Sequence, residues 1–404
     1  MGRGAVRALD EHRAAAFALA APLPAVEVGL ADALGRVLAD DVRTDELLPR
    51  WDNSAMDGYA VRRADVLTVP VVLRVVADLP AGSPDEPVLE PGTAARIMTG
   101  APVPPGADAV VPVEVTDGGS TSVEIRVAPE PAAHIRRAGE DAVPGDLVLA
   151  AGSLLGPAHI AALASTGRSS ALVHRRPRIA VVSTGDELVA PGTALRRGQL
   201  PDSNSWLLAA AVAEAGAEAV RLGPVADDPT ALLDLLHTLD ADPAVDGVVT
   251  SGGVSMGEYD VVKAALLSTP GVEFLPVAVQ PGKPQGLGRL PGGTPIWTLP
   301  GNPVSSFASF EMFVRPAIGR MRGLASVERP TVAAVADEGW RTPPGRAQLM
   351  PVRFVADGHV VPATARGSGS HLVARLALAD GLAIVPAEVD EVVVGASVHV
   401  LKVT

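Results

Sequence analysis

The stretch Ile179-Ala-Val-Val-Ser-Thr-Gly-Asp-Glu187 indicates the fold of the central part of this 404-residue chain. Its first four residues are all apolar, as is typical of a strand that is buried on both faces of a sheet. A polar loop with one glycine and two carboxylates follows at once. Loops at the carboxyl ends of the strands are where ligands bind in open α/β sheets. The stretch therefore favours an α/β domain with a binding edge.

The residues that follow alternate between strand and helix patterns up to about residue 325. Ser203 or Asn204 is the expected cap of the first helix, and Gly216 is its expected end. The alternation predicts a doubly wound, mostly parallel sheet with helices on both faces. The expected strands are 218–222, 247–250, 273–279 and 295–299, and the expected helices are 205–215, 229–239, one from about 260 and one from Pro303.

The regions on either side follow other patterns, and the whole chain is predicted to be a multidomain α/β protein. Residues 1–45 look helical and amphipathic, although Gly29 and Gly35 interrupt them. Residues 69–149 hold short apolar runs separated by proline and glycine, which favours a β-rich module. A helix is expected at 157–165. The last part of the chain alternates apolar and polar residues, which predicts a β-barrel-like domain.

Composition narrows the possible functions. Aromatic residues make up only 3% of the chain against 48% apolar residues in all, so the cores should consist mainly of Ala, Val and Leu. A net charge of −13 argues against nucleic acids or anionic membranes as partners. The absence of cysteine excludes disulfides, thiolate metal sites and cysteine nucleophiles. The histidines lack zinc-site spacing, and neither a P-loop nor a GxGxxG motif follows a strand.

No segment of the sequence predicts a membrane anchor. The longest apolar runs are shorter than the ~18 residues that a membrane-spanning helix needs. Residues 14–24 resemble a signal-peptide core in part, but Asp10 and Glu11 precede them and no cleavage site follows. We therefore expect a cytoplasmic protein without a membrane partner.

Polar loops follow four of the expected strands, at residues 183–187, 226–228, 251–260 and 299–303. Because the carboxyl ends of parallel strands lie at the same edge of a sheet, these loops should meet there. Gly252 and Gly253 would let the backbone approach a ligand closely. The helices that begin near Asp260 and Pro303 would offer unpaired N–H groups to an oxyanion.

The acids of these loops suggest a bound cation. Asp186, Glu187, Asp227, Glu258 and Asp260 would repel a phosphate unless something neutralised them. Mg²⁺ is a hard ion that takes one or two carboxylates together with phosphate oxygens and water. The residues alone therefore lead to the hypothesis of a nucleotide, or another phosphorylated ligand, held through magnesium.

Each of these features also has a simpler structural explanation. A Ser-Gly-Gly loop is often only a turn, and Asp228 and Asn302 precede prolines at helix starts, where they would act as caps. Asp186 and Glu187 also fit solvated loop acids. Lys283, in a Pro-Gly-Lys-Pro turn, is either a phosphate contact or an ordinary surface lysine. The expected gathering of these residues at one edge favours the functional explanation.

Several longer motifs occur in order along the chain. They are DNSAMDGYAVR from residue 52, RIMTGAPVPPGADAVVPVE from 96, IRRAGED from 135, STGDEL from 183, SGGVSMGEYD from 251, PGKP from 281 and LPGNPVSS from 299. Together they resemble the motifs of the molybdopterin molybdenumtransferase family of the MoeA type, which includes the C-terminal domain of gephyrin. The resemblance runs from about residue 5 to residue 400.

The resemblance implies an activity and an assembly. The activity is insertion of molybdenum from molybdate into adenylylated molybdopterin, with Mg²⁺-dependent release of AMP, to give the molybdenum cofactor. The assembly is a homodimer that makes transient contact with the molybdopterin adenylyltransferase. The expected domains are 1–45 plus 142–176 (helical and linking), 46–141 (β-rich, contributing to the cleft across the dimer), 177–326 (α/β, binding molybdopterin and nucleotide) and 327–404 (C-terminal β).

The resemblance also implies roles for individual residues. Asp57, Asp260 and Glu187 look like catalytic or positioning acids, and Asp260, Asp227 and Glu187 look like magnesium ligands. Asp52, Asn53 and Ser54 would shape the first motif or simply make its turns. The other residues implied to contact the substrates are Thr99, Arg136, Arg137, Asp141, Ser251, Gly252, Gly253, Lys283, Pro300, Asn302 and Pro303, together with Arg346 and Ser370 for molybdate.

Two positions depart from the family pattern. Pro276 and Gln280 stand where family members often carry lysines. Phosphate neutralisation would then fall more heavily on Lys283, Arg136, Arg137 and magnesium. The departure also leaves open a preference for another oxyanion, such as tungstate.

Two other classes of function stay open. Gephyrin's matching domain also anchors receptors, so the chain could be mainly a scaffold. A nucleotide pyrophosphatase or amide hydrolase would share the STGDEL α/β domain, but it would have no reason to carry DNSAMDGYAVR or LPGNPVSS. Release of AMP from adenylylated molybdopterin, with and without molybdate, distinguishes these classes from the transferase.

Overall fold

The computed structural model describes residues 6–254, 260–364 and 373–403, and the chain within it forms two compact units. The larger unit consists of Met1–Ala39, Gly152–Leu155 and Leu172–Thr404. The smaller unit consists of Asp40–Ala151 and Gly156–Ala171. Each unit has its own sheet and its own apolar core.

A six-stranded sheet forms the centre of the larger unit. Its strands are β12 (Arg178–Thr184), β15 (Glu218–Val225), β16 (Gly247–Ser251), β17 (Val272–Pro276), β19 (Pro284–Arg289) and β20 (Pro295–Leu299). They lie in the order β15-β12-β16-β20-β19-β17. Neighbours are parallel from β15 to β20, whereas β19 is antiparallel to both of its neighbours. The expected mostly parallel sheet is therefore confirmed.

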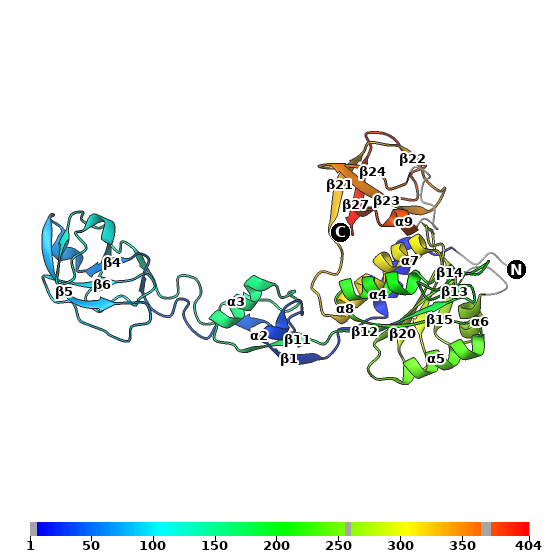
Figure 1. Ribbon diagram of the computed structural model, residues 1–404, viewed down its shortest axis with the longest axis horizontal. Coiled ribbons are helices and arrows are strands. Elements are labelled where there is room, and N and C mark those ends of the chain that lie inside the picture. The colour runs from blue at the N-terminus through cyan, green and yellow to red at the C-terminus, as the bar shows by residue number, and fades with distance from the viewer. Residues whose placement is uncertain (1–5, 255–259, 365–372, 404) are drawn as a thin grey trace. The chain divides into compact units, whose positions relative to one another are not determined.

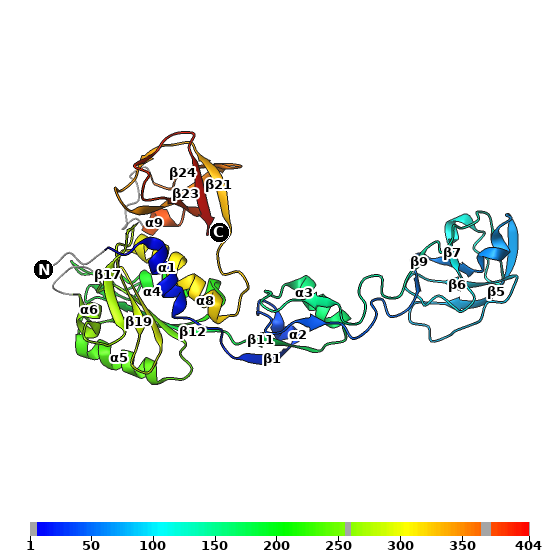
Figure 2. The same cartoon turned by 180° about the vertical axis from the view of Figure 1, so that it is seen from behind.

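The sheet is buried on both faces, as the apolar run at residues 179–182 predicts. Ile179 and Val181 belong to one core, with helices α1 (Leu9–Ala18), α4 (Asn204–Glu214), α7 (Pro303–Ser309), α8 (Arg315–Met321) and the π-helix η3 (Phe310–Val314). Ala180 and Val182 belong to the other core, with α5 (Pro229–Ala241) and α6 (Val261–Leu266). Figure 1 shows the two sets of helices on opposite sides of the sheet, and Figure 2 shows α1 beside α8.

The caps of α4 and α5 differ in kind. Asp228 caps α5 as expected, since its side chain accepts hydrogen bonds from two backbone N–H groups of the first turn. Ser203 occupies the cap position of α4, but its side chain makes no capping hydrogen bond. Asp202 instead accepts the Ser205 N–H at 3.1 Å. Asn204 is the first residue of α4, so its side chain is left for another role.

Strand β19 is the element of the sheet that the sequence pattern does not predict. Pro284, Gly286 and Gly288 lack the side chains that favour strands. Both glycines are nevertheless required by packing. A Cβ at Gly286 would clash with the Thr298 side chain, and one at Gly288 would clash with the carbonyl of Gly271.

The expectation of helix throughout residues 1–45 is wrong. Of the described residues 6–45, only those of α1 and the short α2 (Leu30–Ala33) are helical, whereas β1 (Ala25–Gly29) and β2 (Val42–Arg43) are extended. Pro22 and Pro24 stand between α1 and β1, and proline is poorly tolerated inside a helix. Gly35 adopts φ of 71°, a left-handed conformation that prevents α2 from continuing.

A closed barrel follows the α/β region within the larger unit. Its strands are β21 (Thr331–Ala336), β23 (Ala347–Ala356), β24 (His359–Pro362), β25 (Gly381–Val385) and β27 (Ser397–Lys402), and the pairing of β25 with β23 closes the ring. The expected β-barrel-like region is therefore confirmed. Strand β18 (Val279–Gln280) pairs in parallel with β23 and joins the barrel to the α/β region. Smaller elements are β13 (Leu188–Val189), β14 (Leu200–Pro201), β22 (Trp340–Arg341), β26 (Glu391–Val392) and α9 (Val373–Leu376).

The smaller unit is β-rich, as the runs of residues 69–149 predict. A five-stranded sheet combines β7 (Ala109–Pro112), β4 (Gly58–Val61), β6 (Thr93–Ile97), β5 (Val71–Leu79) and β8 (Ser122–Ile125), in that order. Tyr59 and Val61 face one core, and Ala60 faces another. The remaining elements of this unit are β3 (Asn53–Ser54), β9 (Ile135–Arg136), β10 (Leu147–Leu149), α3 (Pro157–Ser165), η1 (Arg63–Val66) and η2 (Val113–Val115). Strand β11 (Ser170–His174) begins in this unit and continues into the larger one, where Leu172 and the residues after it belong.

Within residues 6–254, 260–364 and 373–403, none of the helices has both the length and the apolar character needed to cross a membrane. The four-part domain division stays a prediction.

Helix α1 is fixed on the larger unit by a buried histidine. His12 is 1% exposed, and its ring meets the Phe313 ring edge-on with 4.7 Å between centroids. Burial lowers the pKa of His12 from 6.5 to about 4, with a smaller contribution from Arg7. The folded protein therefore holds this imidazole neutral.

We expect His12 to make the larger unit acid-sensitive. Between pH 6.5 and about 4 the unfolded chain binds a proton here that the folded chain does not, so stability falls as the pH falls. The full loss is about 3 kcal/mol. Replacement by leucine should flatten the pH dependence of urea unfolding in this window, whereas the same change at the exposed His237 should not. Identical pH profiles for wild type and His12→Leu would contradict the assignment.

Candidate active site

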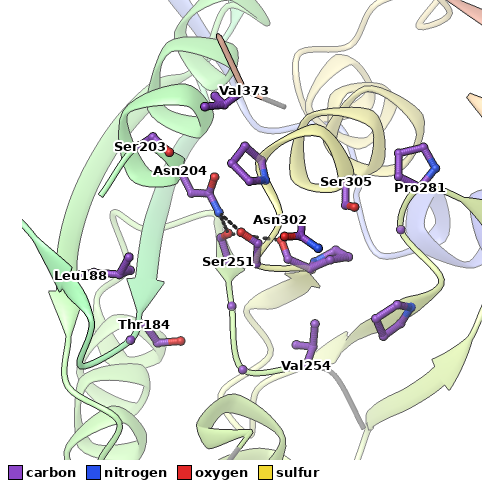
Figure 3. A pocket seen from close by; sticks show the side chains of 18 of the residues that line it. Thr184, Leu188, Ser203, Asn204, Ser251, Val254, Pro281, Asn302, Ser305 and Val373 are labelled. Carbon is purple, nitrogen blue, oxygen red and sulfur yellow. Dashed lines mark hydrogen bonds between the residues drawn. The ribbon is translucent and has the colours of Figure 1, made fainter. Parts of the chain in front are cut away.

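A pocket of about 1030 Å³ lies at the carboxyl ends of the parallel strands in the larger unit. Residues from all four polar loops line it, so the structure brings these loops together at one edge (Figure 3). The residues identified from the sequence that line it are Glu187, Asp227, Ser251, Gly252, Gly253, Asp260, Lys283, Pro300, Asn302, Pro303 and Arg346. Glu258 and Ser370 lie outside the described residues.

Gly252 and Gly253, which follow β16, are required by the protein's own packing. Gly252 and Gly253 have φ of 100° and 62°, in the left-handed region. A Cβ at Gly252 would lie 2.8 Å from the carbonyl oxygen of Thr184, and one at Gly253 would lie 2.8 Å from the Val262 nitrogen. The loop after β16 is thereby pressed against the end of β12 and the start of α6.

Acids crowd the side of the pocket near β12 and β15. The N–H of Asp227 donates to the Asp186 carboxylate at 3.0 Å, and the N–H of Asp186 donates back to Asp227 at 3.3 Å. Burial raises the pKa of Asp227, and the nearby carboxylates of Asp186, Glu187 and Asp260 raise it further. The geometry thus concentrates negative charge that a bound cation would relieve.

Three neutral or basic groups complete the pocket wall. Asn302 precedes α7, but its side chain makes no capping hydrogen bond, so capping does not explain this residue. Lys283 comes from the turn before β19, and Arg346 directly precedes β23 of the barrel. The uncharged Gln280 also lines the pocket.

A hydrogen-bonded network ties the pocket loops to α4. The Asn204 side-chain amide donates to the Ser251 hydroxyl at 2.8 Å and to the Gly301 carbonyl at 2.6 Å (Figure 3). Asp202 accepts the hydroxyls of Ser183 at 2.7 Å and Ser205 at 2.6 Å. Sequence reasoning treated this segment only as a helix start. The sequence feature that could have revealed the network is the pair of polar residues Asp202 and Asn204 on either side of the cap position.

The smaller unit gathers its own set of the predicted residues. One Asp57 carboxylate oxygen accepts the Thr99 N–H at 2.7 Å and the Thr99 hydroxyl at 2.8 Å. These two bonds, the N–H first, lower the pKa of Asp57. Asp52 does not make a local turn, because it bonds to the Arg137 guanidinium and to the Ala138 N–H at 2.8 Å.

The rest of this loop is held by backbone pairing. Asn53 pairs with Arg136 between β3 and β9, and the Ser54 hydroxyl bonds to the Met56 carbonyl as turn chemistry predicts. The Asp141 N–H donates to the Leu48 carbonyl at 2.9 Å. Asp57, Thr99, Arg136 and Arg137 therefore belong to adjoining segments of one unit.

Comparison with known proteins covers almost the whole chain. Residues 7–167 match the family model of the MoeA N-terminal region (domain I and II), residues 180–320 that of a probable molybdopterin binding domain, and residues 333–403 that of the MoeA C-terminal region (domain IV). These matches define a multidomain protein built around a molybdopterin-binding type of α/β fold.

Individual relatives agree with the family models. Molybdopterin molybdenumtransferase 2 of Mycobacterium tuberculosis is 45% identical over 99% of this chain and 100% of its own length. Molybdopterin molybdenumtransferase 1 of the same organism is 36% identical over 98% of both chains. A crystal structure of a molybdopterin biosynthesis MoeA protein from Pyrococcus horikosii superposes with a TM-score of 0.84 at 31% identity, covering 98% of this chain and 99% of that one. The chain belongs to the MoeA family.

The bonds at Asp57 lead to a test by replacement of Thr99. Valine removes the hydroxyl and keeps the N–H, so the pKa of Asp57 should rise but stay below the ~3.9 of an unperturbed aspartate. Because this pKa is lowered in the folded state, the stability that Asp57 contributes is lost as the pH falls through it. NMR titration of the carboxyl carbon measures the change.

Asp117 supplies the internal control for that titration. Its pKa is lowered by the N–H groups of Glu124 and Gly119, which the Thr99 substitution does not touch. Asp117 should titrate identically in both proteins. An unchanged Asp57 titration in Thr99→Val would show that the hydroxyl has no influence on the carboxylate.

Proposed function

We propose that this chain is a molybdopterin molybdenumtransferase, which inserts molybdenum from molybdate into adenylylated molybdopterin and releases AMP. The observation that carries the proposal is the position of the pocket, most of whose lining residues fall within residues 180–320, the segment that matches the molybdopterin binding model. Relatives that match along the full length are named for this transferase activity. That agreement disfavours a scaffold or a nucleotide hydrolase.

The residues of the pocket fit a phosphorylated ligand that is held partly through magnesium. The carboxylates of Asp227, Glu187 and Asp260 are hard donors. The pKa of Asp227 is raised mainly by burial, and the neighbouring carboxylates add to the shift. Among the described residues, no three Asp, Glu, His or Cys side chains form a metal site by themselves. One or two of these carboxylates would therefore share Mg²⁺ with phosphate oxygens and water. When bound, the ion would neutralise charge that develops as AMP leaves.

The chain's own cations would orient the anionic groups. Lys283 and Arg346 line the pocket. Lys283 would contact the phosphates, and Arg346 would hold molybdate. Ser370, which lies outside the described residues, is proposed to share that role. The guanidinium of arginine suits an oxyanion because it offers several donors in a fixed plane. Pro300 and Pro303 would keep the loop between them rigid at this edge.

The residues of the smaller unit are proposed to complete the site in a homodimer. Asp57, held by Thr99, would orient water or a ligand of the metal as an ionised carboxylate, because its lowered pKa keeps it charged. Arg136, Arg137 and Asp141 would join it. Transient contact with the adenylyltransferase, location in the cytoplasm and the four-part division 1–45 plus 142–176, 46–141, 177–326 and 327–404 belong to the same proposal.

The first test is AMP release from adenylylated molybdopterin by the purified protein with magnesium. We expect release that depends on molybdate and yields active cofactor. Asp260→Asn should slow it at saturating magnesium, because a carboxylate is lost from the charged side of the pocket. Release by wild type that ignores molybdate, with simple dinucleotides hydrolysed equally well, would favour a pyrophosphatase instead.

Measurement of magnesium binding in the presence of AMP tests the role of the acidic residues of the pocket without relying on turnover. Asp227→Asn should weaken Mg²⁺ binding on the order of tenfold, the loss typical of altered groups at a metal site. Asp228→Asn is the matched control, since this neighbouring carboxylate caps α5. The control should keep the cap, because asparagine caps helices about as well as aspartate, and it should leave Mg²⁺ affinity unchanged. Equal losses in both variants would refute the assignment of Asp227.

A further inference from the structure

The side-chain amide of Asn204 has a fixed orientation at the edge of the pocket. The Gly301 carbonyl, 2.6 Å from Nδ2, is able only to accept a hydrogen bond. The nitrogen of the amide must therefore face Gly301, and Oδ1 must face the other way. Figure 3 shows the oxygen of Asn204 pointing away from both hydrogen bonds.

The groups that bond to this amide have no further proton to donate. The Ser251 hydroxyl accepts from Asn204 at 2.8 Å and lies 3.0 Å from the Ser306 hydroxyl. Ser306 donates in turn to the Pro300 carbonyl at 2.9 Å. Each hydroxyl thus accepts one bond and donates one, and the chain ends at a carbonyl. None of these groups has a proton left for Asn204 Oδ1.

The oxygen of Asn204 is a buried acceptor without a partner. Asn204 is 9% exposed and lines the pocket, and Oδ1 is buried with no hydrogen bond. Buried polar atoms in native proteins are rarely left unpaired, and an exception calls for a specific explanation. A donor brought in by a ligand would pair with this oxygen without competition from bulk water.

We propose that Asn204 binds the substrate through Oδ1, which accepts a hydrogen bond from an N–H group of a nitrogen heterocycle. The inference rests on the proposed function, since adenylylated molybdopterin carries such donors on both its pterin and its adenine. Oδ1 is an acceptor without a formal charge, in a pocket that also contains Glu187, Asp227 and Asp260. It therefore selects for N–H donors without adding to the repulsion of the phosphates.

Paired ligands identify the donor. Calorimetry would compare AMP with purine riboside monophosphate, which lacks the 6-amino group, on wild type and Asn204→Leu. If adenine is the donor, wild type should prefer AMP about tenfold and the variant should lose that preference, as one polar contact of about 1.4 kcal/mol requires. If the pterin is the donor, AMP binding should be unchanged and molybdopterin should bind the variant about tenfold more weakly. Either result supports the proposal.

A second buried amide provides the matched control. Gln285 donates from Nε2 to the Gly282 carbonyl at 2.6 Å and to the Ser309 hydroxyl at 2.7 Å, and its oxygen is also buried and unpaired. Gln285 does not line the pocket within the described residues. Gln285→Leu should therefore keep the AMP preference and the relative affinity for molybdopterin.

The outcome that overturns the proposal is a loss without selectivity. Asn204→Leu could weaken the binding of AMP, its analogue and molybdopterin equally, or weaken the binding of none of them. Either result would show that Oδ1 accepts no hydrogen bond from these ligands. Asn204→Ser, which introduces less bulk, gives the same comparison if the leucine variant does not fold. Wild-type protein that binds these ligands but releases no AMP with molybdate would refute the proposed function and leave the Asn204 contact standing.

Discussion

Burial of the central sheet on both faces is the constraint on which the larger unit depends. Alternate residues of β12 enter different cores, Ile179 and Val181 one of them and Ala180 and Val182 the other. A strand in this position is mostly apolar, and the buried polar residues of the parallel strands lie at or near the carboxyl ends, namely Ser183, Thr184, Thr250, Ser251 and Thr298. Polar chemistry is therefore concentrated at the strand ends and in the loops that follow them, and parallel pairing places four of these ends at one edge.

The buried polar groups at that edge need hydrogen-bond partners where the strands end. Ser183 and Ser251 are buried near the carboxyl ends of β12 and β16. Ser183 is paired with Asp202 just before α4, and Ser251 is paired with Asn204, the first residue of α4. The same helix that covers one face of the sheet thereby fixes two pocket loops. The hydrogen bonds of Asn204 and Asp202 therefore both hold α4 against the sheet and position the pocket loops. This double role explains why the two residues are buried at the edge of the pocket.

The parts that could be predicted from the sequence were those governed by periodicity. The run 179–182, the helices after it and the convergence of the loops all follow from strand and helix repeats combined with parallel pairing. Strand β19 could not be predicted, because its glycines are selected by cross-strand clearance that only the assembled sheet reveals. The prediction of helix in residues 1–45 was wrong because it gave more weight to the amphipathic spacing than to the two prolines after α1. The contact between Asp57 and Thr99 joins positions 42 residues apart, so local patterns could not reveal it.

The charge balance of the pocket sets the conditions under which an anion binds there. Among its described residues Glu187, Asp202, Asp227 and Asp260 are acidic, whereas Lys283 and Arg346 are the basic ones. The serine hydroxyls that bond to Asp202 are neutral, so four acids stand against two cations in this lining. Gln280 adds no charge. A phosphorylated ligand thus meets net repulsion unless a metal ion accompanies it. Burial is the main reason why the pKa of Asp227 is raised, and repulsion by the neighbouring carboxylates contributes to the same shift. Affinity for a phosphorylated ligand should consequently be coupled to magnesium binding.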